Sequence, residues 1–150
     1  MPEKETLERA TEDKREGKSP STQAGEFVRE EIEHIREGKH GARSAKQAIA
    51  IGLSKARRAG VKLAAPKKGQ ASKSVRKQAA RDLRKGSKGS RKVSAKRSRA
   101  TSRALKREGH SAASKTALSR HAHAAASKRS AASRSKAAKK AARTRKKNRS

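Results

Sequence analysis

The sequence has very few of the large apolar side chains from which a hydrophobic core is built. Val, Ile, Leu and Phe together number 15 of 150 residues, Phe27 is the single aromatic residue, and Trp and Tyr are absent. Such a composition, with a formal net charge of +31, is typical of disordered chains. Substrate pockets are lined mainly by apolar and aromatic side chains. The sequence therefore favours a binding protein and predicts no enzyme activity.

Cysteine is absent, which excludes a disulfide framework, a thiolate metal site and a thiol nucleophile. Residues 1–18 are charged throughout and contain no apolar run, so we expect no secretory signal and no membrane span. The glycine-containing loop GKHGARS does not have the GxxxxGK[ST] spacing of a nucleotide-binding loop. We therefore predict no catalytic residue, no cofactor, no small-molecule substrate and no membrane partner, and we expect a cytoplasmic, nucleoid-associated protein.

The five histidines form no recognisable metal site in the sequence. His121 and His123 are close in sequence, but residues two apart do not face each other on a helix. No carboxylate lies near this pair, and the chain has only two Asp. The sequence therefore predicts no metal site, either at this pair or at His34, His40 and His110.

The charges of opposite sign are separated along the chain. Residues 1–38 contain 11 acidic and 7 basic side chains, whereas residues 39–150 contain 2 acidic and 37 basic side chains. Repulsion on that scale indicates a polyanionic partner for the basic part. Binders of single strands and RNA loops stack bases on aromatic residues, and none follows Phe27. Duplex DNA is therefore favoured, with RNA or the ribosome as the alternative.

The predicted contacts are phosphate contacts made by Lys and Arg, in which affinity comes from charge density and falls steeply with salt. Sequence-specific reading by the helix near residues 44–59 is a weaker alternative, because helix-turn-helix units have a third helix and a larger core. The candidate nucleic-acid-binding residues are Lys39, Arg43, Lys46, Lys55, Arg57, Arg58, Lys62, Lys67, Lys68, Lys73, Arg76, Lys77, Arg91, Lys92, Lys96, Arg97, Arg99, Lys128, Arg129, Lys139, Lys140, Arg143, Arg145, Lys146 and Lys147.

The first confident helix is predicted between residues 19 and 38. Ser19 suits the N-cap position and Pro20 the first helical position, where its missing N–H is no loss. Gly38 is expected to end the helix. The apolar stripe consists of Ala24, Val28, Ile32 and Ile35, with Phe27 beside it.

The second helix, over residues 44–60, has the clearest start and stop signals. Ser44 and Gln47 form a capping box, in which the Ser44 hydroxyl accepts the Gln47 N–H and the Gln47 side chain accepts the Ser44 N–H. Gly60 is expected to take the left-handed conformation at the helix end, with Val61 packing back on the last turn. The apolar stripe is Ala45, Ile49, Leu53 and Ala56.

The short connection between these helices predicts an antiparallel helical hairpin over residues 19–62. Its acidic first helix would lie beside its basic second helix. Burying about eight large apolar side chains stabilises the hairpin by ~12–24 kcal/mol. This is small compared with the conformational entropy that is lost when forty residues become ordered. A free hairpin is therefore marginal, and we expect a homodimer or another partner to complete it.

Residues 63–150 read as a basic arm rich in Lys, Ala, Ser and Arg. Weak helices are predicted over residues 72–85, ended by Gly86, and over residues 98–108 and 111–130. Each has only one or two large apolar residues, so none can form a core alone. We expect disorder in solution and helix where phosphates neutralise the charge.

Residues 21–60 resemble a family of small, basic bacterial proteins with a domain of unknown function, through the run SAKQAIAIGLSKARRAG. Members are loosely labelled DNA-binding or plasmid-stabilisation proteins, and the resemblance implies no catalytic residue. Gly52 stands where the family run has alanine, which is expected to weaken the helix by ~1 kcal/mol. The tail around Ala137–Ala142 is similar in composition to linker-histone and histone-like tails.

Together these observations predict a mostly α-helical protein with extensive disorder. We expect a flexible charged N-terminus (1–18), a helical hairpin module (19–62) and a basic low-complexity arm (63–150). The expected function is non-enzymatic, largely sequence-independent DNA binding of the histone-like, nucleoid-associated kind. The alternative is an RNA- or ribosome-associated basic protein.

Overall fold

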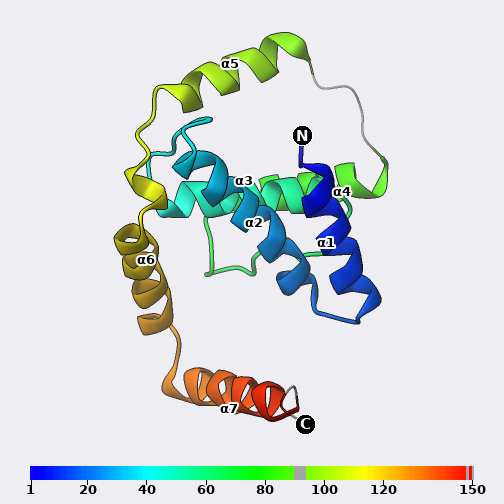
Figure 1. The fold of residues 1–150 in the computed structure, drawn as a ribbon, viewed down its shortest axis with the longest axis vertical. Helices are drawn as coiled ribbons and strands as arrows, with labels where there is room; N and C mark the ends of the chain where they lie inside the picture. Colours follow the sequence, from blue (N-terminus) through cyan, green and yellow to red (C-terminus); the bar gives the residue numbers. More distant parts are fainter. Residues whose placement is uncertain (90–93, 148, 150) are drawn as a thin grey trace. The chain divides into compact units, whose positions relative to one another are not determined.

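A computed structural model describes residues 1–89, 94–147 and 149 of the chain. Seven α-helices and one short 3-10 helix make these residues 72% helical, and they contain no strand. The chain divides into two compact units, Met1–Ser114 and Lys115–Ser150 (Figure 1). The mostly helical fold is confirmed, whereas the extensive disorder that composition predicts is not found in the described residues.

The hairpin at the centre of the first unit consists of α2 (Pro20–Arg36) and α3 (Ala45–Arg58). Ser19 caps α2 by accepting the Thr22 N–H at 3.4 Å, and Ser44 caps α3 by accepting the Gln47 N–H at 3.2 Å. The return bond of the capping box differs from the prediction. Gln47 Oε1 accepts the N–H of Arg43 at 2.7 Å, one residue before the cap.

The end of α3 follows the pattern expected of a glycine stop. Gly60 has φ +98°, and its N–H donates to the Arg57 carbonyl at 3.1 Å. The Val61 N–H donates to the Ala56 carbonyl, also at 3.1 Å. These two bonds form a Schellman motif, and Val61 is buried against the last turn as predicted.

Helices α2 and α3 meet through small residues of α3. Its buried face is formed by Ala45, Ala48, Gly52 and Ala56. The buried face of α3 is therefore rotated about the helix axis relative to the predicted apolar stripe. Ile49 and Leu53 are only half-buried. A Cβ atom added at Gly52 would lie 2.6 Å from the Cα of Val28. The two backbones therefore approach as closely as they do only because position 52 has no side chain.

Residues that were expected to be mobile form α1 (Lys4–Arg15), which packs on α2. Thr6 and Ala10 are buried in this contact, and Ala10 joins the core cluster that contains Phe27. Arg9 forms an ion pair with Glu26 of α2 at 2.8 Å. The segment is too polar to form a core alone, but it orders by covering the hairpin.

The opposite side of the hairpin is covered by α4 (Lys73–Ser87), which packs on α3. Gly86 does not end this helix as predicted, because α4 continues through it. A Cβ atom at Gly86 would lie 2.0 Å from the Arg57 carbonyl oxygen. The glycine is needed for close approach to the end of α3.

The chain then returns to the hairpin through α5 (Ala95–Lys106) and the 3-10 helix η1 (Ser111–Ala113). The Gly41 N–H donates to the Leu105 carbonyl at 2.9 Å, and the Ala42 N–H donates to the Gly109 carbonyl at 3.0 Å. Ala113 is buried, and its carbonyl accepts from Arg36 Nε at 2.9 Å. These bonds attach the end of α5 to the loop between α2 and α3.

The second unit contains α6 (Lys115–Ser127) and α7 (Ala131–Lys147). Neither helix has a buried residue. Alanine, lysine and arginine are strong helix formers, which accounts for α7, a helix that the sequence reading did not predict. No described helix combines the length and the apolar character that crossing a membrane requires.

The partner that the hairpin was expected to need is supplied by the same chain. Helix α1, helix α4 and η1 all contact α2 or α3. Phe27 and Ile35 of α2 are 1% and 0% exposed. The structure therefore does not support a homodimer built on an open apolar face of the hairpin.

Candidate nucleic-acid interface

Four predicted phosphate-binding residues of the hairpin region instead form ion pairs within the first unit, and they are Lys39, Arg43, Lys55 and Arg58. Lys39 lies 3.2 Å from Glu3 and 3.0 Å from Glu37, and these carboxylates raise the pKa of Lys39. Arg43 lies 3.5 Å from Glu108 and stays 81% exposed. Lys55, Arg57 and Arg58 are also engaged, as described below. Lys46 of α3 is exposed.

Arg57 is buried at the end of α3 and stabilises the segment that follows this helix. It is 7% exposed, and its guanidinium donates to the carbonyls of Leu63 and Ala64 at 3.1 and 3.2 Å. Burial lowers the pKa of Arg57, although the Asp82 charge opposes this shift. These bonds hold the chain that leaves α3, and they direct the guanidinium away from solvent.

Asp82 of α4 joins α4 to α3. Its carboxylate is 1% exposed and accepts from Ser54 Oγ at 2.7 Å, Arg58 Nε at 2.8 Å and Gln78 Nε2 at 3.0 Å. Burial acts to raise the pKa of Asp82, but the bonds from Ser54 and Arg58 outweigh it and leave the pKa below its usual value. Arg58, whose side chain stays 48% exposed, therefore pairs with a buried carboxylate of the neighbouring helix.

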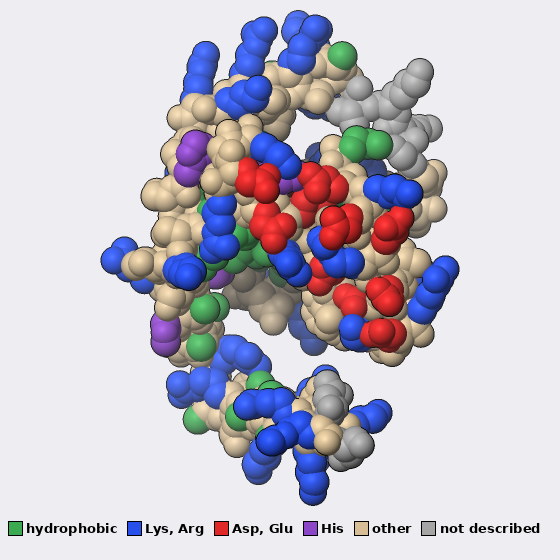
Figure 2. Space-filling model, viewed as in Figure 1, with side chains coloured by type: hydrophobic (Ala, Val, Ile, Leu, Met, Phe, Trp, Pro, Cys, Tyr) green, Lys and Arg blue, Asp and Glu red, His purple; other side chains and the backbone are tan. Residues whose placement is uncertain are grey.

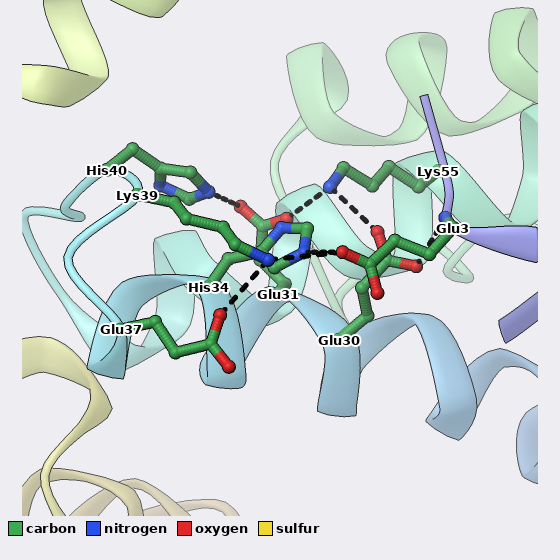
Figure 3. A network of polar contacts seen from close by, with 8 residues as sticks. All are labelled: Glu3, Glu30, Glu31, His34, Glu37, Lys39, His40 and Lys55. Atoms are coloured by element: carbon green, nitrogen blue, oxygen red, sulfur yellow. Dashed lines mark hydrogen bonds and ion pairs between the residues drawn. The ribbon is translucent and has the colours of Figure 1, made fainter. Parts of the chain in front are cut away.

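Lys55 belongs to a second polar network (Figure 3). Its ammonium lies 2.6 Å from Glu31 Oε2 and 3.4 Å from Glu30 Oε1. Glu30 and Glu31 are 2% and 0% exposed. Buried carboxylates require a cation, so Lys55 neutralises the acidic side of α2. The predicted contact between the acidic helix α2 and the basic helix α3 is therefore the ion pairing of Lys55 with these two carboxylates.

The network continues to Glu3 and to two histidines. His34 Nε2 lies 2.8 Å from Glu3 Oε1, and this bond, followed by the one from Lys39, lowers the pKa of Glu3. His40 Nε2 lies 3.2 Å from Glu31 Oε1. Sequence reading missed this cluster. The sequence contained one indication of it, the spacing Glu31-x-x-His34, because residues three apart lie on the same face of a helix.

The basic side chains of α4 and α5 face solvent. Lys96, Arg99, Arg103 and Lys106 of α5 are all exposed and, at 3.6 residues per turn, fall within an arc of ~80°. Figure 2 shows Lys and Arg side chains standing in a row along α5. On α4, Lys73 and Lys77 are exposed and Arg76 is half-buried. These helices therefore add a set of exposed positive charges to the first unit.

Helix α7 has the highest density of positive charge among the described helices. Eight of its 17 residues are Lys or Arg, and all eight are exposed. Six of them fall within an arc of ~120°, with alanines opposite. These six, named here the α7 cationic face, are Lys136, Lys139, Lys140, Arg143, Lys146 and Lys147.

Most acidic residues belong to a different part of the sequence from these helices, since 11 of the 13 lie in residues 1–38. No Asp or Glu follows Glu108 in the sequence, so Lys115–Ser150 contains 13 basic residues and no acidic residue. In the first unit, Figure 2 shows the acidic side chains gathered on one face, over α1 and α2. This face carries the opposite charge to the exposed sides of α4 and α5, so the charge of the first unit is unevenly distributed.

The other predicted residues are exposed or lie outside the described part of the chain. Arg91 and Lys92 lie outside the described residues. The remaining candidates are exposed, and they are Lys62, Lys67, Lys68, Arg97, Lys128, Arg129 and Arg145. Within the predicted set, the cations engaged within the fold lie near the hairpin, whereas Lys46 and most of the candidates from Lys62 onward are exposed.

A family model, described as a family of unknown function (DUF6496), matches residues 13–69. This span covers α2, α3 and the chain that leaves α3, and it includes the run on which the sequence resemblance rests. The match agrees with a domain of unknown function. No curated protein and no solved structure matched the chain.

Proposed function

We propose that this protein binds duplex DNA without enzymatic activity and largely without sequence preference, by neutralising phosphates with the exposed cations of α4, α5 and α7. The observation that carries the proposal is the run of 13 basic and no acidic residues in Lys115–Ser150. No carboxylate side chain of that unit can neutralise these charges. A polyanion is the partner that removes their mutual repulsion.

The geometry of the basic helices favours a duplex backbone as the ligand. The described basic helices have no aromatic residue on which a base could stack, and such stacking is the usual basis of single-strand binding. A cationic stripe of ~120° on a straight helix suits a row of phosphates. The proposed location is accordingly the nucleoid, and the proposed role is compaction or protection of DNA.

The test is the salt dependence of binding for the full chain and two neutralised variants. One variant replaces the α7 cationic face by Gln at all six positions. The other replaces Lys96, Arg99, Arg103 and Lys106 by Gln. Glutamine has nearly the helix propensity of lysine, so the helices should persist. Each lost phosphate contact should reduce the slope of log K against log salt by ~0.9.

A matched control removes four positive charges from the acidic side of the molecule. It replaces Lys4, Lys14, Arg15 and Arg29, all exposed, by Gln. The α5 variant should reduce the slope by up to ~4 and the α7 variant by up to ~5, whereas the control should change it by less than ~1. Equal effects of control and α5 variants would show that net charge alone governs binding. Tighter binding to structured RNA than to duplex DNA at equal salt would favour the ribosomal alternative.

A further inference from the structure

Two histidines and a buried carboxylate meet where α2 ends, and DNA binding does not use them. Glu31 and His34 are three residues apart on α2 and share a face. Gly38, with φ +75°, turns the chain so that His40 returns to the same place. One ligand atom from each of the three residues lies within 4.8 Å of the other two.

The first observation that points to a cation is the state of Glu31. Its side chain is 0% exposed, and within the described part of the chain neither carboxylate oxygen accepts a hydrogen bond of good geometry. Lys55 lies beside Oε2 and is shared with Glu30. His40 Nε2 lies 3.2 Å from Oε1.

The second observation is the orientation of His40. Its Nδ1 lies 3.1 Å from the Gly41 carbonyl oxygen, which only accepts, so Nδ1 carries the proton. In the neutral ring, Nε2 then presents a lone pair to Glu31 Oε1. Two acceptors at this distance repel each other unless a proton or a metal ion lies between them. Metal–ligand bonds of ~2.0–2.1 Å at a tetrahedral angle place two ligand atoms ~3.3 Å apart.

The third observation concerns His34, whose ring lies between Glu3 and Glu31 (Figure 3). Its Nε2 lies 2.8 Å from Glu3 Oε1. Histidines that bind a metal through one ring nitrogen commonly donate the other N–H to a carboxylate, which fixes the ring. Glu3 and the Gly41 carbonyl would serve as these outer partners for His34 and His40.

We propose that Glu31, His34 and His40 bind a divalent transition-metal ion of the zinc class. Two imidazoles and one carboxylate are a common ligand set for Zn²⁺, with the fourth position left to water. The ion would join the loop after α2 to the helix itself. The same loop holds α5 through Gly41 and Ala42, so bound metal would stabilise the attachment of a DNA-binding helix.

The experiment titrates the metal-free full chain with Co²⁺, whose visible spectrum reports tetrahedral coordination, and then displaces Co²⁺ with Zn²⁺. We expect one tightly bound ion per chain. His34→Gln and His40→Asn should each weaken binding at least as much as the ~10–100-fold typical of a lost outer partner. The double variant His121→Ala/His123→Ala should bind as tightly as the parent.

Two further variants separate the site from general effects on folding. Glu3→Gln should weaken Zn²⁺ binding ~10-fold, whereas Glu5→Gln, on the exposed side of α1, should not change it. Lys55→Met removes a competing positive charge and should tighten binding at least ~10-fold. Zn²⁺ should also slow hydrogen exchange at the Gly41 and Ala42 amides.

Several results would overturn the site. Among them are Co²⁺ binding that survives both histidine substitutions, or that disappears when His121 and His123 are replaced. Absence of a tetrahedral spectrum, or weaker binding by Lys55→Met with its helix content retained, would also count against it.

Discussion

Replacing Gly52 by alanine should destabilise the protein, although alanine is the better helix former. On propensity alone, Gly52→Ala in the middle of α3 gains ~1 kcal/mol. The structure opposes this gain, because the added Cβ would lie 2.6 Å from Val28 Cα, 2.9 Å from Val28 N and 3.0 Å from Phe27 O. All three are backbone atoms, so no side-chain rotation can relieve the contact.

The magnitude follows from how far α2 and α3 must separate. Carbon atoms in contact lie ~3.5–4.0 Å apart, so the helices must move apart by ~1 Å at this crossing. Overpacking costs ~1–3 kcal/mol, and a backbone contact belongs at the upper end of that range. The net expectation is a loss of ~2 kcal/mol, which lowers the unfolding temperature by ~8 °C at ~4 °C per kcal/mol.

Scanning calorimetry of the full chain measures this effect, and Gly25 supplies the matched control. Gly25 lies inside α2 on an exposed face, and a Cβ atom there would meet nothing within 4 Å. Gly25→Ala should therefore stabilise the protein by ~0.5–1 kcal/mol. If Gly52→Ala stabilises as much as Gly25→Ala, the close crossing of α2 and α3 is wrong.

Three further predictions concern caps and buried charges. Asp82 has a folded-state pKa below its usual value, so its contribution to stability is complete above about pH 4 and is lost as the pH falls through the lower folded pKa. Asp82→Asn should flatten this acid limb in pH-dependent melting and cost ~1–2 kcal/mol at neutral pH; an unchanged limb would refute the assignment. Arg57→Met should cost ~1–3 kcal/mol in chemical unfolding yet leave the salt slope of DNA binding unaltered, and a reduced slope would place Arg57 in the interface. Ser44→Ala should cost ~1 kcal/mol in the same unfolding assay, and a neutral result would contradict the N-cap.

The hairpin was predictable because its signals are local. Ser19, Pro20 and Gly38 set the bounds of α2, and Ser44 and Gly60 set those of α3, each through a side-chain or backbone property that needs no distant contact. The opposite charges of the two helices also predicted that acidic side chains of α2 would contact basic side chains of α3. Lys55 forms this contact with the α2 carboxylates.

The parts that were not predictable depend on contacts between distant segments. Composition gave no reason to order residues 1–18, since α1 is held by contacts with α2 that no local pattern encodes. Gly86 was predicted to end its helix, because glycine near the end of a helical pattern is a common stop signal. Its role in the structure is close approach to the Arg57 carbonyl, and a contact between distant segments cannot be read from the local sequence. The histidine cluster was missed because His40 joins Glu31 and His34 only after the turn at Gly38.

The sequence predicted that Lys and Arg residues form the interface, but it could not show which of them are exposed. The fold determines which of these cations form contacts within the protein and which face solvent. Charge density alone could not distinguish Arg57, buried at the end of α3, from Lys139 on the exposed face of α7. The distinction depends on which cations have a carboxylate or a carbonyl within reach. Those partners occur mainly on α1, on α2 and in the segment after α3, so the basic charge that stays exposed lies mainly further along the chain.

The most direct test of the central claim is the salt dependence of full-chain binding to a duplex of arbitrary sequence. If the exposed cations of α5 and α7 contact about ten phosphates, log K should fall against log salt with a slope near ~−9, and duplexes of different sequence should give the same line. A slope shallower than ~−3, or an unchanged slope after neutralising the α7 cationic face, would contradict the account.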